Sequence, residues 1–289
     1  MKDRDPRRTR RSSAGTRQVG RGGSAAGTLR RAASGVPGRN AGADAATRQP
    51  KADFVTYLTE SRDIGVSVVL VLPLLLAYEI AVAVLQPTAR NGAELFVARL
   101  LAQLDPLILT VLRRGTAVVL IAVALAWLLH HPPRVARLRW LLAEAALLAL
   151  LLGPLLGLLV GGLGLSLSAG PESASGPVWQ PFLLSVGAGV WEELVFRLGL
   201  LGGLTILLVR VLSLPRPASF AIALIVSSLV FALYHHVGHH GEPVTAGRFA
   251  FRALAGTIIG LLFASRGLAV VVYMHVFYDV LCDLRSLSD

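Results

Sequence analysis

Two adjacent carboxylates inside an apolar stretch are the most unusual feature of the sequence. Glu192 and Glu193 lie within Val190–Phe196, a segment that is otherwise hydrophobic. An ionisable group in hydrocarbon is costly, so each carboxylate needs a partner or a function. Glu193 and Arg197 are spaced i, i+4 and can pair on one helix face. Glu192 points about 100° away on a helix, which leaves it free to act as a general base on water.

Two further polar patterns lie in later apolar stretches. His235 ends the uncharged run Ala218–Tyr234, one helical turn after Phe231. His275 and Asp279 are i, i+4 neighbours in a third stretch. If the three patterns converge, they supply one free carboxylate, two imidazoles and a further polar group. Such a set suffices for peptide hydrolysis, with a glutamate as base, a histidine beside it, and donors for the developing oxyanion.

A metal site is the alternative use of the same residues. Catalytic zinc is commonly held by two histidines and a glutamate, with the fourth position open to water. Glu192, His235 and His275 would provide that set. The sequence leaves the metal-free and the zinc version open, so the predicted cofactor is either none or zinc.

A second histidine cluster offers another candidate metal site. His235, His236, His239 and His240 form two i, i+4 pairs, either of which would hold a transition metal if the segment were helical. Glycines interrupt the segment, so we expect His239 and His240 to be loop residues at the membrane edge. The common His-Glu-x-x-His zinc motif does not occur in the sequence.

Composition predicts that these patterns sit in membrane-spanning helices. Of 289 residues, 54% are hydrophobic and only 16% are charged, which excludes a disordered protein and argues against a soluble one. Leu and Ala dominate the apolar segments, which favours an all-α transmembrane helix bundle of about seven to eight spans. The seven predicted spans are roughly 64–86, 108–130, 140–168, 181–210, 218–237, 248–265 and 267–284. Residues 92–107 are either an interfacial amphipathic helix or an eighth span.

The N-terminal segment has a different composition. Residues 1–51 carry thirteen Lys and Arg against three Asp, a net charge of +10 out of +11 for the chain. We predict that residues 1–52 are a disordered basic cytoplasmic tail and that residues 53–289 are the transmembrane domain. The tail would set the topology and offers a site for anionic lipid. We expect no specific nucleic-acid partner.

The three polar patterns resemble, in order, the signature motifs of the CPBP or Abi family, the CAAX prenyl protease and bacteriocin-processing intramembrane proteases. The motifs are Glu192-Glu193-x-x-x-Arg197, Phe231-x-x-x-His235 and His275-x-x-x-Asp279. The resemblance covers a catalytic core at about residues 180–284. Each motif alone is short, and the specificity lies in all three occurring in order, each in its own apolar segment.

The resemblance implies a helical membrane fold and a role for each motif residue. Glu192 would activate the hydrolytic water with His235 assisting, and His275 and Asp279 would stabilise the oxyanion. The supporting residues would be Glu193, Arg197 and Phe231.

Asp279 stands where several relatives have Asn. An ionised Asp cannot donate a hydrogen bond to an oxyanion. It would have to be protonated, orient His275 or ligate a metal.

The predicted function is an intramembrane endopeptidase of a bacterial plasma membrane, with its N-terminus in the cytoplasm. Its partners would be membrane lipids and a membrane-associated polypeptide substrate, either prenylated or of bacteriocin type. One alternative is a non-catalytic membrane immunity or binding factor. Another is a proton-coupled transporter that uses the buried carboxylates as a relay.

Overall fold

The structure, a computed structural model, describes residues 56–58, 60–87, 90–102, 135–166, 177–237 and 241–287, with isolated positions between 105 and 130. These residues lie in one compact unit, Asp44–Asp289. The predicted tail, residues 1–52, lies outside the described residues, as does much of the predicted span 108–130. Both therefore stay predictions.

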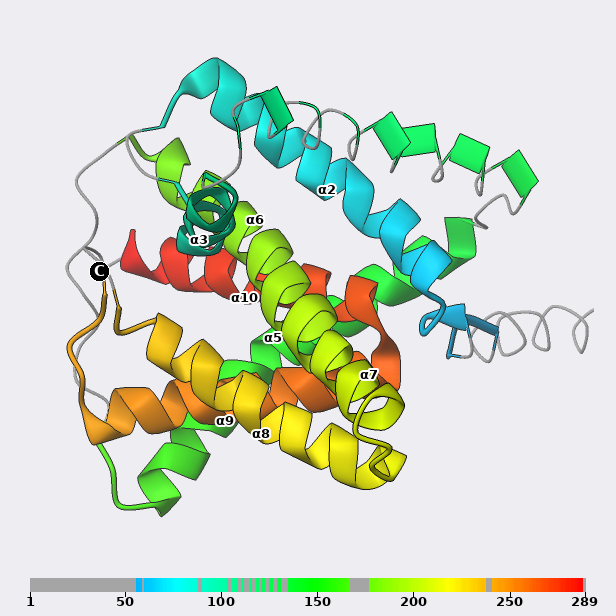
Figure 1. Ribbon diagram of the computed structural model, residues 1–289. Helices are drawn as coiled ribbons and strands as arrows, with labels where there is room; N and C mark the ends of the chain where they lie inside the picture. The colour runs from blue at the N-terminus through cyan, green and yellow to red at the C-terminus, as the bar shows by residue number, and fades with distance from the viewer. Residues whose placement is uncertain are drawn as a thin grey trace, which may run out of the picture. The chain divides into compact units, whose positions relative to one another are not determined.

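All secondary structure elements in the described part of the chain are helices, which confirms the all-α part of the predicted fold class (Figure 1). One long helical run changes from α to π geometry and back. The elements are α2 (Ile64–Leu85), α3 (Gly92–Leu101), α5 (Val135–Gly162), α6 (Trp179–Glu192), the π-helix η1 (Glu193–Gly202), α7 (Gly203–Arg210), α8 (Arg216–Tyr234), α9 (Ala246–Arg266) and α10 (Leu268–Ser286).

Four of the described helices are long and apolar enough to cross a membrane. They are Ile64–Leu85, Leu138–Gly162, Arg216–Tyr234 and Ala246–Arg266. Helix α3 has ten residues and is therefore about 15 Å long. A bilayer core is about 30 Å thick, so α3 is too short to be the eighth span considered for residues 92–107.

Polar side chains cap the first turns of three of the described helices, α2, α3 and α9. Asp63 accepts the backbone N–H of Val66 at the start of α2, and Thr245 accepts that of Arg248 at the start of α9. Asn91 accepts two backbone N–H groups at the start of α3. Each cap satisfies donors that the first helical turn leaves without partners.

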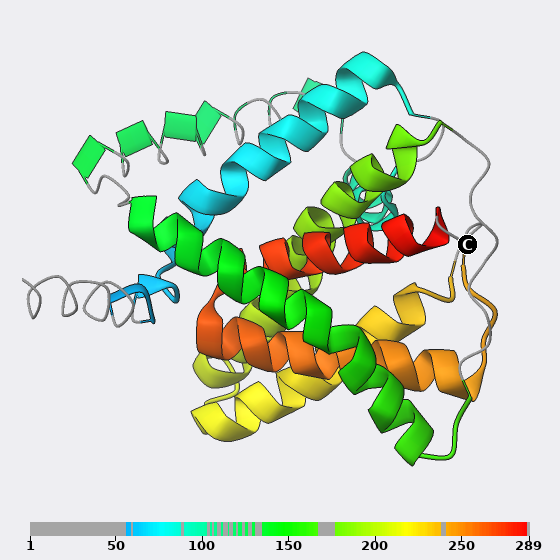
Figure 2. The same ribbon diagram turned by 180° about the vertical axis from the view of Figure 1, so that it is seen from behind.

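Helix α10 is the centre of the packing. Its first five residues, 268–272, are almost completely buried. Helix α6 crosses it on one side (Figure 1), and α5 runs diagonally across the other side (Figure 2). Gly189 allows the close approach of α6, because an added Cβ would lie 2.4 Å from Cγ2 and 2.8 Å from the backbone nitrogen of Val276.

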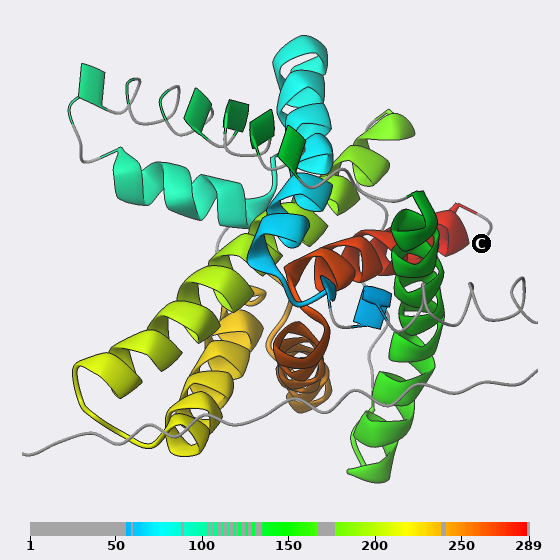
Figure 3. The same ribbon diagram turned by 90° about the vertical axis from the view of Figure 1, so that its right-hand side faces the viewer.

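Helices α7, α8 and α9 form the remaining wall of the bundle. Helices α7 and α8 run side by side (Figure 3), and α8 packs along α9. Gly256 and Gly260 permit that second contact, because Cβ atoms there would meet Ser228 and Leu224. Gly267, with φ at +87°, joins α9 to α10, and a Cβ there would lie 2.2 Å from the carbonyl oxygen of Ser61.

A partly buried ion pair fixes the end of α9 against α5. Arg266 donates through Nε and Nη2 to the two carboxylate oxygens of Glu144, at 2.6 and 2.7 Å. Tyr57 donates to the same carboxylate, and its ring lies beneath the guanidinium. Glu144 is therefore a structural residue, because a bidentate arginine satisfies both of its oxygens.

Substituting Gly189 with Ala is expected to destabilise the bundle. The new methyl group would clash with the backbone of α10, which cannot move aside as a side chain can. We therefore expect the free energy of unfolding to fall by about 1–3 kcal/mol. Gly157→Ala is the matched control in α5, where nothing lies within 4 Å of the added Cβ. It should leave stability unchanged or raise it by up to about 1 kcal/mol. Thermal unfolding in detergent measures both, and equal midpoints for the two variants would contradict the packing described.

Candidate active site

Glu192 and Glu193 lie where helix geometry changes. Glu192 is the last residue of α6 and Glu193 the first of η1. π-Helical turns are rare and occur often at functional sites. The wider turn still places residues four apart on one side, so Glu193 and Arg197 face each other as the spacing predicts.

Glu193 is completely buried and has two partners. Its Oε2 lies 3.2 Å from Nε of Arg197, which is also buried. Its Oε1 accepts from Nδ1 of His275 at 2.7 Å. Glu193 therefore compensates the arginine and also fixes the imidazole of α10, a contact that the sequence motifs do not suggest.

Arg197 connects the first motif to the second. Its guanidinium carbon lies 4.2 Å from the ring centre of Phe231, in cation–π geometry. The carbonyl oxygen of Phe231 accepts from Nδ1 of His235 at 2.8 Å, and the two rings are 4.6 Å apart. Phe231 thus both covers the arginine and orients the histidine.

The carboxylate of Glu192 faces both imidazoles. Its Oε2 lies 3.7 Å from Nε2 of His235 and 4.0 Å from Nε2 of His275. Glu192 is 5% exposed, and this oxygen has no hydrogen-bond partner among the described residues. Because Phe231 can only accept through its carbonyl, Nδ1 of His235 carries a proton, and neutral His235 presents a lone pair on Nε2.

Asp279 completes the group from one turn further along α10. Its Oδ2 lies 3.5 Å from Nε2 of His275, and its side chain is 26% exposed. The cluster consequently reaches from buried Glu193 to a partly exposed carboxylate. All four residues for which the sequence predicts catalytic roles lie together, as do their three predicted supporting residues.

Asn91 is a site residue that sequence reasoning missed. It precedes α3, far from the motifs in sequence, and its Nδ2 donates to Oε1 of Glu192 at 3.3 Å. The only local signal was an asparagine before an amphipathic segment, which is typical of a helix N-cap. Nothing in that pattern indicates a contact over 101 residues of sequence separation.

The segment after α8 holds His235 from the other side. Glu242 donates its backbone N–H to the carbonyl oxygen of His235 at 2.8 Å, and its carboxylate pairs with Arg252 of α9. His236 instead contacts the carbonyl oxygen of Glu242 through Nδ1 at 3.0 Å. The two neighbouring histidines therefore have different surroundings, and of these two only His235 faces Glu192.

The two predicted metal sites stay predictions. The described residues contain no group of three or more His, Cys, Asp or Glu side chains arranged to hold a metal ion. His239 and His240 of the second cluster lie outside the described residues. Metal dependence is a prediction that a strong chelator tests in the cleavage assay.

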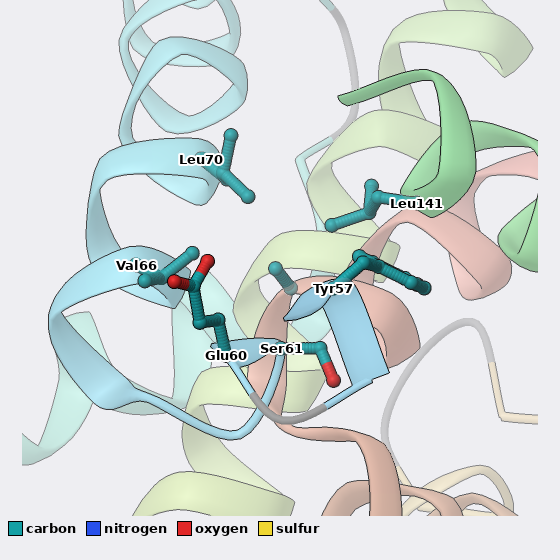
Figure 4. A pocket seen from close by; sticks show the side chains of 7 residues that line it. Tyr57, Glu60, Ser61, Val66, Leu70 and Leu141 are labelled. Carbon is teal, nitrogen blue, oxygen red and sulfur yellow. The ribbon is translucent and has the colours of Figure 1, made fainter. Parts of the chain in front are cut away.

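A separate pocket lies between α2, α5 and α10 (Figure 4). None of its lining residues belongs to the Glu192 cluster, so we do not assign it to the candidate site. The lining consists of Tyr57, Glu60, Ser61, Val66, Leu70, Leu141 and Ala269.

Comparison with known proteins agrees with the motifs. Residues 174–281 match the family model described as type II CAAX prenyl endopeptidase Rce1-like. No curated protein and no solved structure gives a significant match to the chain. The matched segment contains all three motifs, with Glu192, His235, His275 and Asp279, which confirms the resemblance derived from the sequence. Residues 174–281 are therefore similar to Rce1-like domains, type II CAAX prenyl endopeptidases of the CPBP family.

Proposed function

We propose that the protein is an intramembrane endopeptidase in which Glu192 activates the hydrolytic water. The observation that carries the proposal is the free oxygen of Glu192, which is buried, lacks a hydrogen-bond partner among the described residues, and faces two imidazole nitrogens. The separations of 3.7 and 4.0 Å are longer than hydrogen bonds. Above about 3.5 Å, a water molecule can bridge two polar groups.

The first chemical step follows from this arrangement. Glu192 takes a proton from water while the water oxygen forms a bond to the scissile carbonyl carbon. The lone pair on Nε2 of His235 lies on the same side and shares the proton transfer. In the second step the C–N bond breaks, the departing amine receives the proton, and the new terminus leaves as a carboxylate.

His275 and Asp279 are proposed to stabilise the oxyanion. The imidazole of His275 lies among Glu192, Glu193 and Asp279, and three carboxylates favour its protonated form. Its Nε2–H then donates to the developing oxyanion in a largely buried site, where such a bond is stronger than in bulk water. An ionised Asp279 has no need to donate in this scheme, because it compensates the imidazolium instead.

The membrane setting and the substrate belong to the same proposal. The continuous run α6–η1–α7 and helix α10 are also long enough to cross a bilayer. Together with the four candidate spans and the predicted span 108–130, they would complete the predicted seven-span arrangement. We propose that the protein lies in a bacterial plasma membrane and that its cytoplasmic tail binds anionic lipid. We propose that its substrate is a prenylated or bacteriocin-type polypeptide.

Removing the proposed base should abolish cleavage. Glu192→Gln keeps the shape of the side chain but cannot take a proton, and we expect a loss of about 10²–10⁴-fold in kcat/KM. His235→Ala should lose about 10²-fold or more. The measurement is cleavage of a quenched fluorescent prenylated C-terminal peptide in detergent, and His236→Ala is the matched control with expected near-normal activity.

The same assay separates the alternatives. Activity that persists in a strong chelator supports the metal-free scheme. Activity that the chelator abolishes and added zinc restores supports the zinc version. Full activity in Glu192→Gln would contradict the proposal. No cleavage by wild-type protein would exclude prenyl-peptide specificity and favour the binding-factor alternative.

Asp279 provides an independent prediction. Asp279→Asn should retain activity within about tenfold, because an amide can donate to the oxyanion directly. Asp279→Ala provides neither charge nor donor, and we expect a loss of about 10²–10³-fold in kcat. If both variants lose activity equally, the proposed role of this carboxylate is wrong.

A further inference from the structure

We infer that Asn91 is a positioning residue for Glu192, an assignment that rests on the proposed function. Asn91 lies outside the Rce1-like segment, residues 174–281. Its Nδ2 donates to Oε1 of Glu192 at 3.3 Å, and both residues are buried. The site is thus completed by an element that the family match does not contain.

The orientation of the Asn91 amide is set by helix α3. Its Oδ1 accepts the backbone N–H of Ala93 at 2.8 Å and that of Glu94 at 3.4 Å. Those donors require an oxygen, so a rotated amide would lose the helix cap. The NH₂ group must consequently face Glu192, where it finds a carboxylate oxygen that can only accept.

Helix α2 holds the start of α3 in place. Tyr78 donates to Oε2 of Glu94 at 2.7 Å and accepts weakly from the backbone N–H of Asn91 at 3.5 Å. Arg90 donates to the other oxygen of Glu94 at 2.9 Å. The Tyr78 ring lies against α6 at Gly187, where an added Cβ would be 2.5 Å from it.

Helix α8 closes the opposite side. Gly92, the first residue of α3, lies so near Tyr234 that an added Cβ would be 2.3 Å from the phenolic oxygen. Tyr234 directly precedes His235 in the chain. The start of α3 is therefore held between residues of α2 and α8, and α3 packs on α6 (Figure 1).

This contact divides the two oxygens of Glu192 between two tasks. Asn91 holds Oε1, and Oε2 is left to face His235 and His275. A carboxylate without the Asn91 contact would rotate about its last side-chain bonds. A displacement of about 1 Å can cost about 10²-fold in rate, so the amide matters to turnover more than to substrate binding.

Two variants remove the donor and keep the cap. Ser and Asp cap helices about as well as Asn, but Ser is too short to reach Glu192 and an ionised Asp has no N–H to donate. We expect Asn91→Ser to lower kcat about 10–100-fold with KM nearly unchanged, and Asn91→Asp to lower it at least as much. Unchanged kcat in both variants would overturn the assignment.

A double-mutant cycle tests the contact without relying on activity. Asn91→Ser should lower the unfolding midpoint in detergent by about 2–4 °C. In the Glu192→Leu background the same substitution should lower it much less, because the hydrogen bond is already absent. Equal shifts in the two backgrounds would show that Asn91 is a helix cap alone and would overturn the assignment.

Asp63→Ser is the matched control, since it changes the N-cap of α2 and should leave kcat unchanged. The two measurements also separate this inference from the proposed function. If the double-mutant cycle shows coupling but wild-type protein cleaves no peptide, the result counts against the protease and supports the contact between Asn91 and Glu192. If wild-type protein cleaves the peptide but the cycle shows no coupling, the result counts against the role of Asn91 and supports the protease.

Discussion

The buried pair of Glu193 and Arg197 is the interaction on which the candidate site depends. Removing either partner would leave a charge without compensation in a nearly water-free interior, which typically costs several kcal/mol. Each partner also reaches another helix. Glu193 orients His275 of α10, and Arg197 lies on Phe231 of α8, whose carbonyl oxygen orients His235. One ion pair thus determines how both imidazoles are presented.

The direction of both imidazoles follows from this support. Each Nδ1 is engaged, that of His235 by a backbone carbonyl and that of His275 by a carboxylate. Both Nε2 atoms are therefore left to face Oε2 of Glu192, which is buried and has no hydrogen-bond partner among the described residues. The sequence predicts the same difference between the two adjacent glutamates, because only Glu193 has an arginine four residues later.

Local spacing predicts contacts within an element and fails for contacts between elements. The i, i+4 intervals correctly indicated the Glu193–Arg197 pair and the closeness of His275 to Asp279, because each pair lies on one helix. They indicated neither the contact of Glu193 with His275 nor that of Asn91 with Glu192. The π-helix was also missed, since an apolar segment with several glycines reads like any α-helical span. The all-α fold class was predictable from composition. The predicted span 140–168, however, extends several residues past the end of α5 at Gly162.

The most direct test of the account is where the oxygen of the hydrolytic water goes. We would follow a single turnover of a prenylated C-terminal peptide in H₂¹⁸O by mass spectrometry of both the product and the peptide that contains Glu192. Direct attack by water activated at Glu192 predicts one ¹⁸O atom in the new product carboxylate and none in the protein. Unlabelled product with ¹⁸O in Glu192 would show that the glutamate attacks the substrate itself, and would contradict its role as the base.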